Sequence, residues 1–291
     1  MFYFTKGDDC MVIGFAGAGK VGVSLGKYFC SNGIKLSGYY SRTYLSAEQA
    51  SKFTNSKAYA DIESLINDSK IIFLTTPDDS LSNIWNVMSK FDLRGKLVCH
   101  TSGSLSSKIF SDICDLGAYG YSVHPIFAFS DKFSCYKKLN TACFSIEGDT
   151  DYIFELKSLI ESLGNKVFII EADKKPLYHL ACVTVSNLVL SLINIGCSYL
   201  AECGIAYEDA LSSLMPLIEN NIDNLKSSGF ISSLTGPVER SDFGTVKRHM
   251  EVIPEEHKEL YRVLSLNLLN LSVKKHCERD YTEIRDYLRS V

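Results

Sequence analysis

The sequence predicts an α/β fold in which a mostly parallel sheet, covered by helices on both faces, is followed by an all-α region. Two observations carry this prediction. Up to Ile170, short apolar strands alternate with helical patterns, and the first strand runs directly into a glycine-rich turn. After Ile170 the β-branched runs stop and only helical patterns follow. Strands that alternate with crossover helices form parallel sheets.

Length and composition narrow the class of protein. A chain of 291 residues that is 46% hydrophobic is long enough for two domains. A net charge of -4 gives no sign of a nucleic-acid groove or a polybasic membrane patch. The start, MFYFTKGDDC, lacks the pattern of a signal peptide, so we expect the 10 cysteines to be reduced thiols of a cytoplasmic protein. No pair has C-x-x-C spacing, and no metal site is predicted.

The strands of the first region are apolar runs bounded by turn residues. We expect them at residues 10–15, 34–40, 71–76, 96–100, 119–124, 141–148 and 166–170. Helical patterns lie between them, after Lys20 and at residues 46–53, 81–89, 105–114 and 152–163.

The second region is read as helices at residues 177–203, 207–225, 244–250 and 254–275, with a short helix at the C-terminus. Pro254 with two acids after it is a helix-start signal. We set the domain boundary at residues 172/173. Residues 177–201 contain no Asp, Glu, Lys or Arg and are long enough to span a bilayer. Because polar residues interrupt this run, we expect a buried central helix of a soluble domain.

The glycine-rich turn has the order G-x-G-x-x-G. Gly17, Gly19 and Gly22 follow the strand CMVIGF and open a helix with apolar residues at helical spacing. This arrangement directs backbone N–H groups and the positive end of a helix at a pyrophosphate. Gly17 permits the turn, Gly19 lets the phosphate approach, and Gly22 lets helix and strand pack closely. The first domain, residues 1–172, is therefore predicted to be a Rossmann dinucleotide-binding domain.

The end of the second strand indicates which dinucleotide binds. NAD-selective sites place Asp or Glu there, whereas this strand ends in YYSRT with no acid before Glu48. Hydroxyl groups and a guanidinium can bind a 2′-phosphate, and Arg42 can stack on the adenine, which favours NADP(H). Arg42 as a solvated loop charge is the alternative. The predicted cofactor contacts are Gly17, Ala18, Gly19, Lys20, Val21, Gly22, Ser41, Arg42, Thr43, Thr75, Thr76, Pro77, Thr101 and Ser102.

Candidate catalytic residues follow strands or lie on the long apolar helix. Ligands of such sheets bind beyond the carboxyl ends of the strands, where His100 and His124 stand. On the helix, Lys175, His179 and Ser186 fall in one arc, with Asn187 and Asn194 at its edge. The opposite arc is read as Tyr178, Cys182, Val185, Val189 and Leu192. Buried polar groups need partners, which a cofactor, a substrate, a neighbouring helix or a second subunit would supply.

The stretch SLTGPVERSDFGTVKRHM mixes turn residues with charges before a helix. Such a loop suits a ligand, and Arg240 could bind a substrate carboxylate. A surface ion pair between Arg240 and Asp242 is the alternative.

Taken together, these motifs resemble a known family. GFAGAGKVG, YYSRT, HTSGSL, VHPIFAF, KKPLYHLACVTVSN and LTGPVERSD span nearly the whole chain. They resemble the Rossmann-like NADP oxidoreductases with a C-terminal DUF2520 domain, within the superfamily of pyrroline-5-carboxylate reductase and 6-phosphogluconate dehydrogenase-like enzymes. The resemblance implies an NADP-binding domain, a helical domain at residues 173–291 for substrate and dimerisation, and a homodimer. Lys175 lies near the lysine of the K-x-x-x-N pattern of β-hydroxyacid dehydrogenases, but the fourth position on is His179.

The leading hypothesis is an NADP(H)-dependent oxidoreductase that passes a hydride to or from a small carbonyl, imine or hydroxy compound in an interdomain cleft. Reduction needs a proton donor, for which we choose His179, with Lys175 as electrostatic helper or alternative acid. Asn187 would orient the substrate, Ser186 and Arg240 would bind it, and His124 and His100 rank behind His179. The alternatives are a non-catalytic NADP-binding redox sensor and, more weakly, a flavin reductase.

Overall fold

The structure is a computed structural model that describes residues 11–291. The predictions for residues 1–10, namely the absence of a signal peptide and a strand that starts at Cys10, lie outside the described residues. The chain divides into two compact units, Met1–Val189 and Leu190–Val291. Each unit is described by itself.

The first unit is built on an eight-stranded sheet in the described part of the chain, with the order β3-β2-β1-β4-β5-β6-β7-β8. Neighbouring strands are parallel except β6 and β7, which are antiparallel. The predicted mostly parallel sheet is therefore confirmed. Its strands are β1 Ile13–Ala16, β2 Leu36–Tyr40, β3 Lys57–Tyr59, β4 Ile71–Leu74, β5 Leu97–His100, β6 Tyr119–Ile126, β7 Cys143–Gly148 and β8 Lys166–Ile169.

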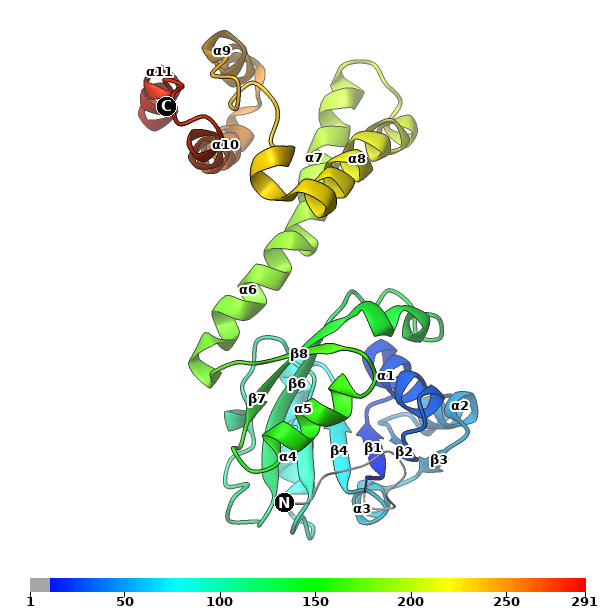
Figure 1. The fold of residues 1–291 in the computed structure, drawn as a ribbon. Helices are drawn as coiled ribbons and strands as arrows, with labels where there is room; N and C mark the ends of the chain where they lie inside the picture. Colours follow the sequence, from blue (N-terminus) through cyan, green and yellow to red (C-terminus); the bar gives the residue numbers. More distant parts are fainter. Residues whose placement is uncertain (1–10) are drawn as a thin grey trace. The chain divides into compact units, whose positions relative to one another are not determined.

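Helices pack on both faces of this sheet (Figure 1). They are α1 Lys20–Ser31, α2 Tyr44–Thr54, α3 Ile62–Asn67, α4 Asp78–Met88 and α5 Ile153–Glu161. One core holds the aromatic stack of Phe15, Tyr39 and Phe73 together with residues of α1 and α5. The other core holds residues of α3 and α4, including the buried Trp85. The central strands β1 (IGFA) and β4 (IIFL) bury every residue and are apolar throughout.

Three parts of the first unit differ from the sequence prediction. The helix expected at residues 105–114 is wrong: this segment contains only the 3-10 turn Ser107–Ile109 and a further turn in which Asp112 has φ 57°. A buried carboxylate explains part of the difference, because Glu147 accepts hydrogen bonds from the backbone N and the hydroxyl of Ser107 at 2.7 and 2.8 Å. The elements β3 and α3 were missed because each is only a few residues long.

The second unit is helical, as predicted. Its helices are most of α7 Asn187–Glu202, and then α8 Tyr207–Ser233, α9 Phe243–Val252, α10 Glu255–Lys275 and α11 Thr282–Ser290. Helix α8 is kinked at Gly229, which has φ 72°. A small core of Val246, Leu269, Ile284 and Leu288 joins α9, α10 and α11.

The long apolar helix is interrupted. Helix α6, Lys175–Val185, ends at Ser186, and α7, Asn187–Glu202, follows it directly. By its contacts α6 belongs to the first unit, although its sequence was assigned to the second domain. The expectation of a buried central helix is wrong for the single chain, because Leu177, Leu180 and Leu188 are exposed. By length and composition alone, residues Ala172–Glu202 are the one stretch of the described chain that could cross a membrane.

Candidate functional site

The glycine-rich turn lies between β1 and α1, as the motif predicts. Gly17 has φ 126°, a conformation that side chains disfavour, and a Cβ there would lie 2.7 Å from the Thr75 hydroxyl. A Cβ on Gly22 would lie 2.3 Å from the same hydroxyl and 2.5 Å from the Gly17 carbonyl oxygen. Gly19, the N-cap of α1, has open space where a Cβ would stand. The turn is thus tight at two glycines and open at the third, where an anion could approach the helix N-terminus.

A cleft of about 670 Å³ opens above this turn. The predicted contacts that line it are Gly17, Ala18, Gly19, Ser41, Arg42, Thr43, Thr75, Thr76 and Pro77. Gly22 lies behind the turn, and neither it nor Lys20, Val21, Thr101 and Ser102 lines the cleft. The structure therefore brings together residues from the carboxyl ends of β1, β2 and β4, as expected for a sheet of this topology.

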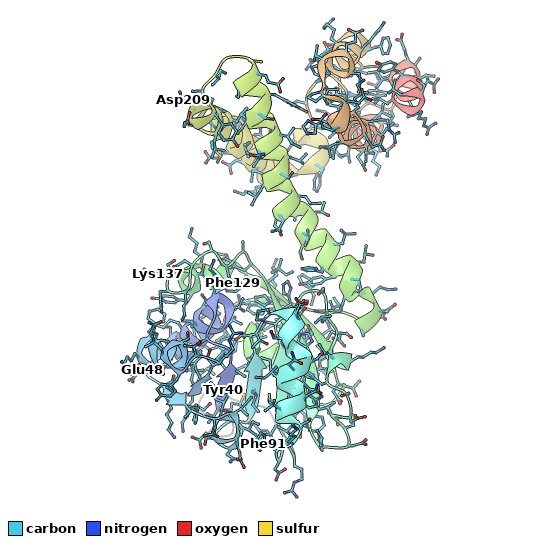
Figure 2. All side chains as sticks on the ribbon, turned by 180° about the vertical axis from the view of Figure 1, so that it is seen from behind. Tyr40, Glu48, Phe91, Phe129, Lys137 and Asp209 are labelled. Atoms are coloured by element: carbon cyan, nitrogen blue, oxygen red, sulfur yellow. The ribbon has the colours of Figure 1, made fainter. Side chains whose placement is uncertain are left out.

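Sequence reasoning missed one wall of the cleft. Ser80, Asn83, Ile84 and Val87 of α4 line it at helical spacing, together with Ser46 of α2 and Tyr40 at the end of β2, which is labelled in Figure 2. The i, i+3, i+4, i+7 pattern in α4 was visible in the sequence. It could have been found by asking which helix follows the strand predicted at residues 71–76.

Among residues 11–291, the lining carries no group that would repel an anion. No Asp or Glu of the described chain lines the cleft, and Arg42 is exposed at its edge, so a 2′-phosphate would meet no like charge. The hydroxyl oxygen of Thr76 is buried without a hydrogen-bond partner. Buried hydroxyl groups are normally bonded, and a bound ligand would supply the partner.

A second group of polar residues lies at the same edge of the sheet, beside the loop that follows β5. Lys175 is 0% exposed, and its ammonium donates hydrogen bonds to the Ser102 carbonyl oxygen at 2.9 Å and the Ser122 hydroxyl at 2.6 Å. The Ser122 hydroxyl in turn donates to the Ser102 carbonyl oxygen at 3.1 Å. Asp78 at the start of α4 accepts hydrogen bonds from Ser102 and Ser104, so the loops after β4 and β5 are joined.

Two imidazoles stand over Gly103 in that loop. A Cβ on Gly103 would lie 2.6 Å from Cδ2 of His179 and 3.0 Å from Nε2 of His124. The two rings are 6.4 Å apart between centroids and nearly perpendicular. Nδ1 of His124 lies 2.6 Å from the Tyr178 hydroxyl. Three of the predicted catalytic residues, Lys175, His179 and His124, are therefore neighbours.

Tyr178 was placed on the wrong arc of the helix. At 100° per residue, positions three and four apart share a face, so Tyr178 and His179 flank Lys175. The structure places its hydroxyl on His124, as described above, and Lys175 lies 5.6 Å from the centre of its ring. Tyr178 is thus part of the cluster and not of an apolar face.

Burial shapes the charges in this cluster. It lowers the pKa of His124 to about 4, with a smaller contribution from the nearby Lys175 ammonium. It also lowers the pKa of Lys175 to about 8, although the negative charges of Glu147 and Asp78 act in the opposite direction. Near neutral pH, His124 is therefore uncharged while Lys175 keeps most of its charge.

His100 is not part of the open site. Its ring is 0% exposed and packs on Phe110, with 5.5 Å between centroids. Nδ1 accepts a hydrogen bond from the Ser102 backbone N at 3.2 Å, and burial lowers its pKa to about 4. This residue supports the loop that carries Gly103, and its ring is closed to a substrate.

The remaining predicted residues are exposed or have local contacts. Ser186 and Asn187 are exposed, and the Ser186 hydroxyl donates to the Cys182 carbonyl oxygen at 2.7 Å. In the second unit Asn194 accepts a hydrogen bond from Tyr207, and Arg240 is exposed. Asp242 caps α9 by accepting hydrogen bonds from the backbone N and the hydroxyl of Thr245 at 3.0 and 2.8 Å; the ion pair with Arg240 was the alternative interpretation.

The chain matches two family models. Residues 7–125 match the model described as a Rossmann-like domain, and residues 142–268 match the model described as a domain of unknown function, DUF2520. The chain combines a Rossmann-like domain with a DUF2520 domain. Both were expected from the motifs, and the DUF2520 match begins at β7, so it covers α6 and the candidate residues of that helix as well as most of the second unit.

Solved structures share this fold. A protein from Thermotoga maritima is 26% identical with a TM-score of 0.72, over 91% of this chain and 100% of that one. A candidate NADP oxidoreductase from Bacteroides fragilis is 20% identical with a TM-score of 0.70, over 90% and 99%. The 1-pyrroline-5-carboxylate reductase of Streptococcus pyogenes is 13% identical with a TM-score of 0.64, over 92% and 99%. Among curated proteins, none matches the chain.

The burial of the Lys175 ammonium predicts that the free energy of unfolding depends on pH. Its pKa is about 8 in the folded chain and near its ordinary value of 10.5 when unfolded, so between these values the unfolded chain binds more protons. Stability therefore rises with pH in this window. Relative to Lys175→Met, the wild type is expected to gain about 2 kcal/mol of unfolding free energy between pH 7.5 and 9.5. Urea unfolding followed by the fluorescence of Trp85 measures it; parallel pH curves for the two proteins would contradict it.

Proposed function

We propose that the chain is an NADP(H)-dependent oxidoreductase that transfers a hydride to or from a small carbonyl, imine or hydroxy compound. The observation that carries this proposal is the pair of imidazoles over Gly103, at the same edge of the sheet as a cleft whose lining fits a dinucleotide. Neighbours in fold support it: a reductive aminase and an imine reductase from Aspergillus terreus were crystallised with NADPH and NADPH4, respectively. The proposal includes a cytoplasmic location and closure of the site by the helical domain.

NADPH, when bound, supplies the hydride to the carbon of a C=O or C=N bond. The glycine turn and the α1 N-terminus would hold its pyrophosphate, and Arg42 its 2′-phosphate. The oxygen or nitrogen of the substrate takes up the bond electrons and a proton. His179 is half-buried beside Gly103 and is our proton donor.

The other residues have supporting roles in this proposal. Lys175 is enclosed, so it acts through its positive charge and through its hold on the Ser102 carbonyl. Asn187 would orient the substrate, and Ser186 and Arg240 would bind it. His100 stays outside the reaction.

We also propose a homodimer. The window of highest hydropathy in Ala172–Glu202 has a mean hydropathy of 1.9 and is only 6% buried in the single chain. Such an apolar surface requires a cover, and a second copy of the chain is the cover proposed here.

The cofactor assignment predicts a change in selectivity. Arg42→Ala is expected to weaken NADPH binding by about tenfold to a hundredfold, the value of a charge-assisted bond to phosphate, and to weaken NADH binding much less, since NADH has only the adenine for Arg42 to contact. Titration calorimetry on the full chain measures both, with Lys90→Ala, an exposed cation outside the cleft lining, as the matched control. Wild-type protein that binds NADH as tightly as NADPH would refute the selectivity.

The reaction is tested by NADPH oxidation against a panel of small carbonyl and imine compounds. For a substrate found there, His179→Ala should slow single-turnover oxidation by about 10²- to 10³-fold, the contribution of general acid catalysis, with NADPH affinity unchanged. His249→Ala, an exposed histidine of the second unit, is the control. Unchanged chemistry in His179→Ala removes that residue from the role. Tight NADPH binding with no oxidation across the panel favours the non-catalytic redox sensor.

The homodimer predicts that the full chain sediments at twice its chain mass. Leu180→Glu places a charge on the exposed apolar face of α6 and is expected to yield monomers, because an unpaired charge is costly in an apolar interface. Glu202→Gln, at the end of α7, is the control. A wild-type monomer, or a protein that associates only with lipid vesicles, would contradict the proposal.

A further inference from the structure

In the hydrogen bond between Tyr178 and His124, the Tyr178 hydroxyl is the donor and Nδ1 of His124 is the acceptor. The 2.6 Å separation of the hydroxyl oxygen and Nδ1 is shorter than the 2.9–3.0 Å usual for an N–H donor to oxygen, and it suits an O–H donor. A phenol is also a better donor to a neutral imidazole nitrogen than that imidazole is to a phenol oxygen. Burial raises the pKa of Tyr178, so its hydroxyl keeps the proton that it donates.

This direction fixes the tautomer of His124. A neutral imidazole carries one proton, and when Nδ1 accepts a hydrogen bond the proton resides on Nε2. Nε2 is the atom that lies over Gly103, 3.0 Å from the place where a Cβ would stand. Gly103 has no side chain, and this lets Nε2 of His124 and the ring of His179 lie close against the loop after β5.

The surroundings hold His124 in its neutral form. The ring is half-buried against Tyr178 of α6 and His179 beside it. Among the charged groups near it, the Lys175 ammonium opposes a positive charge on the ring, as does His179, whereas Asp78 favours one. Burial acts in the same direction as Lys175, so a second cation in this place is strongly disfavoured.

We propose that Tyr178 is a positioning residue that fixes His124 as a neutral Nε2–H donor to the substrate oxygen or nitrogen, while His179 supplies the proton. This inference rests on the proposed function and deepens it by dividing the work between the two imidazoles. A neutral imidazole that polarises a carbonyl is suited to stabilise the negative charge that develops when hydride arrives. It does not itself lose a proton in the step.

The first experiment reads the tautomer directly and needs no substrate. With ¹⁵N-labelled histidine in the full chain, only six imidazoles contribute signals, and His124→Gln assigns the one of interest. At pH 7.5 we expect a pyridine-type Nδ1 and a pyrrole-type Nε2 for His124. Tyr178→Phe should shift this ring toward the other tautomer. A pyrrole-type Nδ1 in the wild type, or a spectrum unchanged by Tyr178→Phe, would overturn the inference.

The chain offers a matched control. Tyr199 lies 2.9 Å from Nδ1 of His257 in the second unit, so Tyr199→Phe removes an equivalent hydroxyl from a different ring. It should alter the signals of His257 and leave those of His124 unchanged. Circular dichroism of both variants checks that the fold is intact.

The second experiment uses the substrate found by NADPH oxidation. Tyr178→Phe should lower kcat by about a hundredfold, the loss of one preorganised donor, with the NADPH dissociation constant unchanged. A kcat within twofold of wild type would overturn the role in the reaction. If no compound of the panel is reduced, the proposed function fails, and the tautomer measurement still decides the contact between Tyr178 and His124.

Discussion

The candidate site depends on the buried ammonium of Lys175. It is enclosed, it binds the Ser102 carbonyl oxygen and the Ser122 hydroxyl, and it stands at the first turn of α6. Taking a charge out of water is costly unless hydrogen bonds and opposite charge compensate. Here two short bonds and the nearby Glu147 and Asp78 carboxylates do so. Since the compensating groups belong to β6, β7, the loop after β5 and the start of α4, α6 is held at this edge of the sheet, and its next turn places Tyr178 and His179 beside Gly103.

The same loop is fixed by carboxylates from two other elements. Asp78 binds the hydroxyls of Ser102 and Ser104, and Glu147 of β7 binds Ser107. Charge-assisted hydrogen bonds of this kind are stronger than neutral ones. They explain why the segment after β5 forms no helix: its backbone and side chains are bonded to fixed acceptors elsewhere. Gly103 therefore lies in a loop that is ordered by its neighbours, and a site on such a loop can hold a substrate in a defined position.

Sequence patterns predicted the elements that depend on neighbouring residues and missed the features that depend on contacts between residues far apart in the chain. The seven predicted strands and the place of the glycine turn were correct because apolar periodicity and turn residues act within a few positions. The absent helix at residues 105–114 needed Glu147, forty residues away from Ser107. Tyr178 was misplaced for another reason: it looked apolar beside Cys182 and Val185, although its angle puts it next to Lys175. The exposure of α6 could not be predicted from the sequence. A helix without charged residues has the same pattern whether its apolar face is covered by its own chain or by another molecule.

The arrangement also explains why two histidines at one site can differ. His124 is on β6, where burial and the Lys175 ammonium both disfavour a positive charge on its ring. His179 is on α6, one helical turn after Lys175. A proton donor must exchange its proton with water between turnovers, which requires access. A hydrogen-bond donor must instead keep its proton and its direction, which requires burial and a fixed partner. Both rings are half-buried, and His124 has the fixed partner in Tyr178 that a donor requires. The strand supplies rigidity to the donor, and the helix leaves the proton carrier at the half-buried side of Gly103.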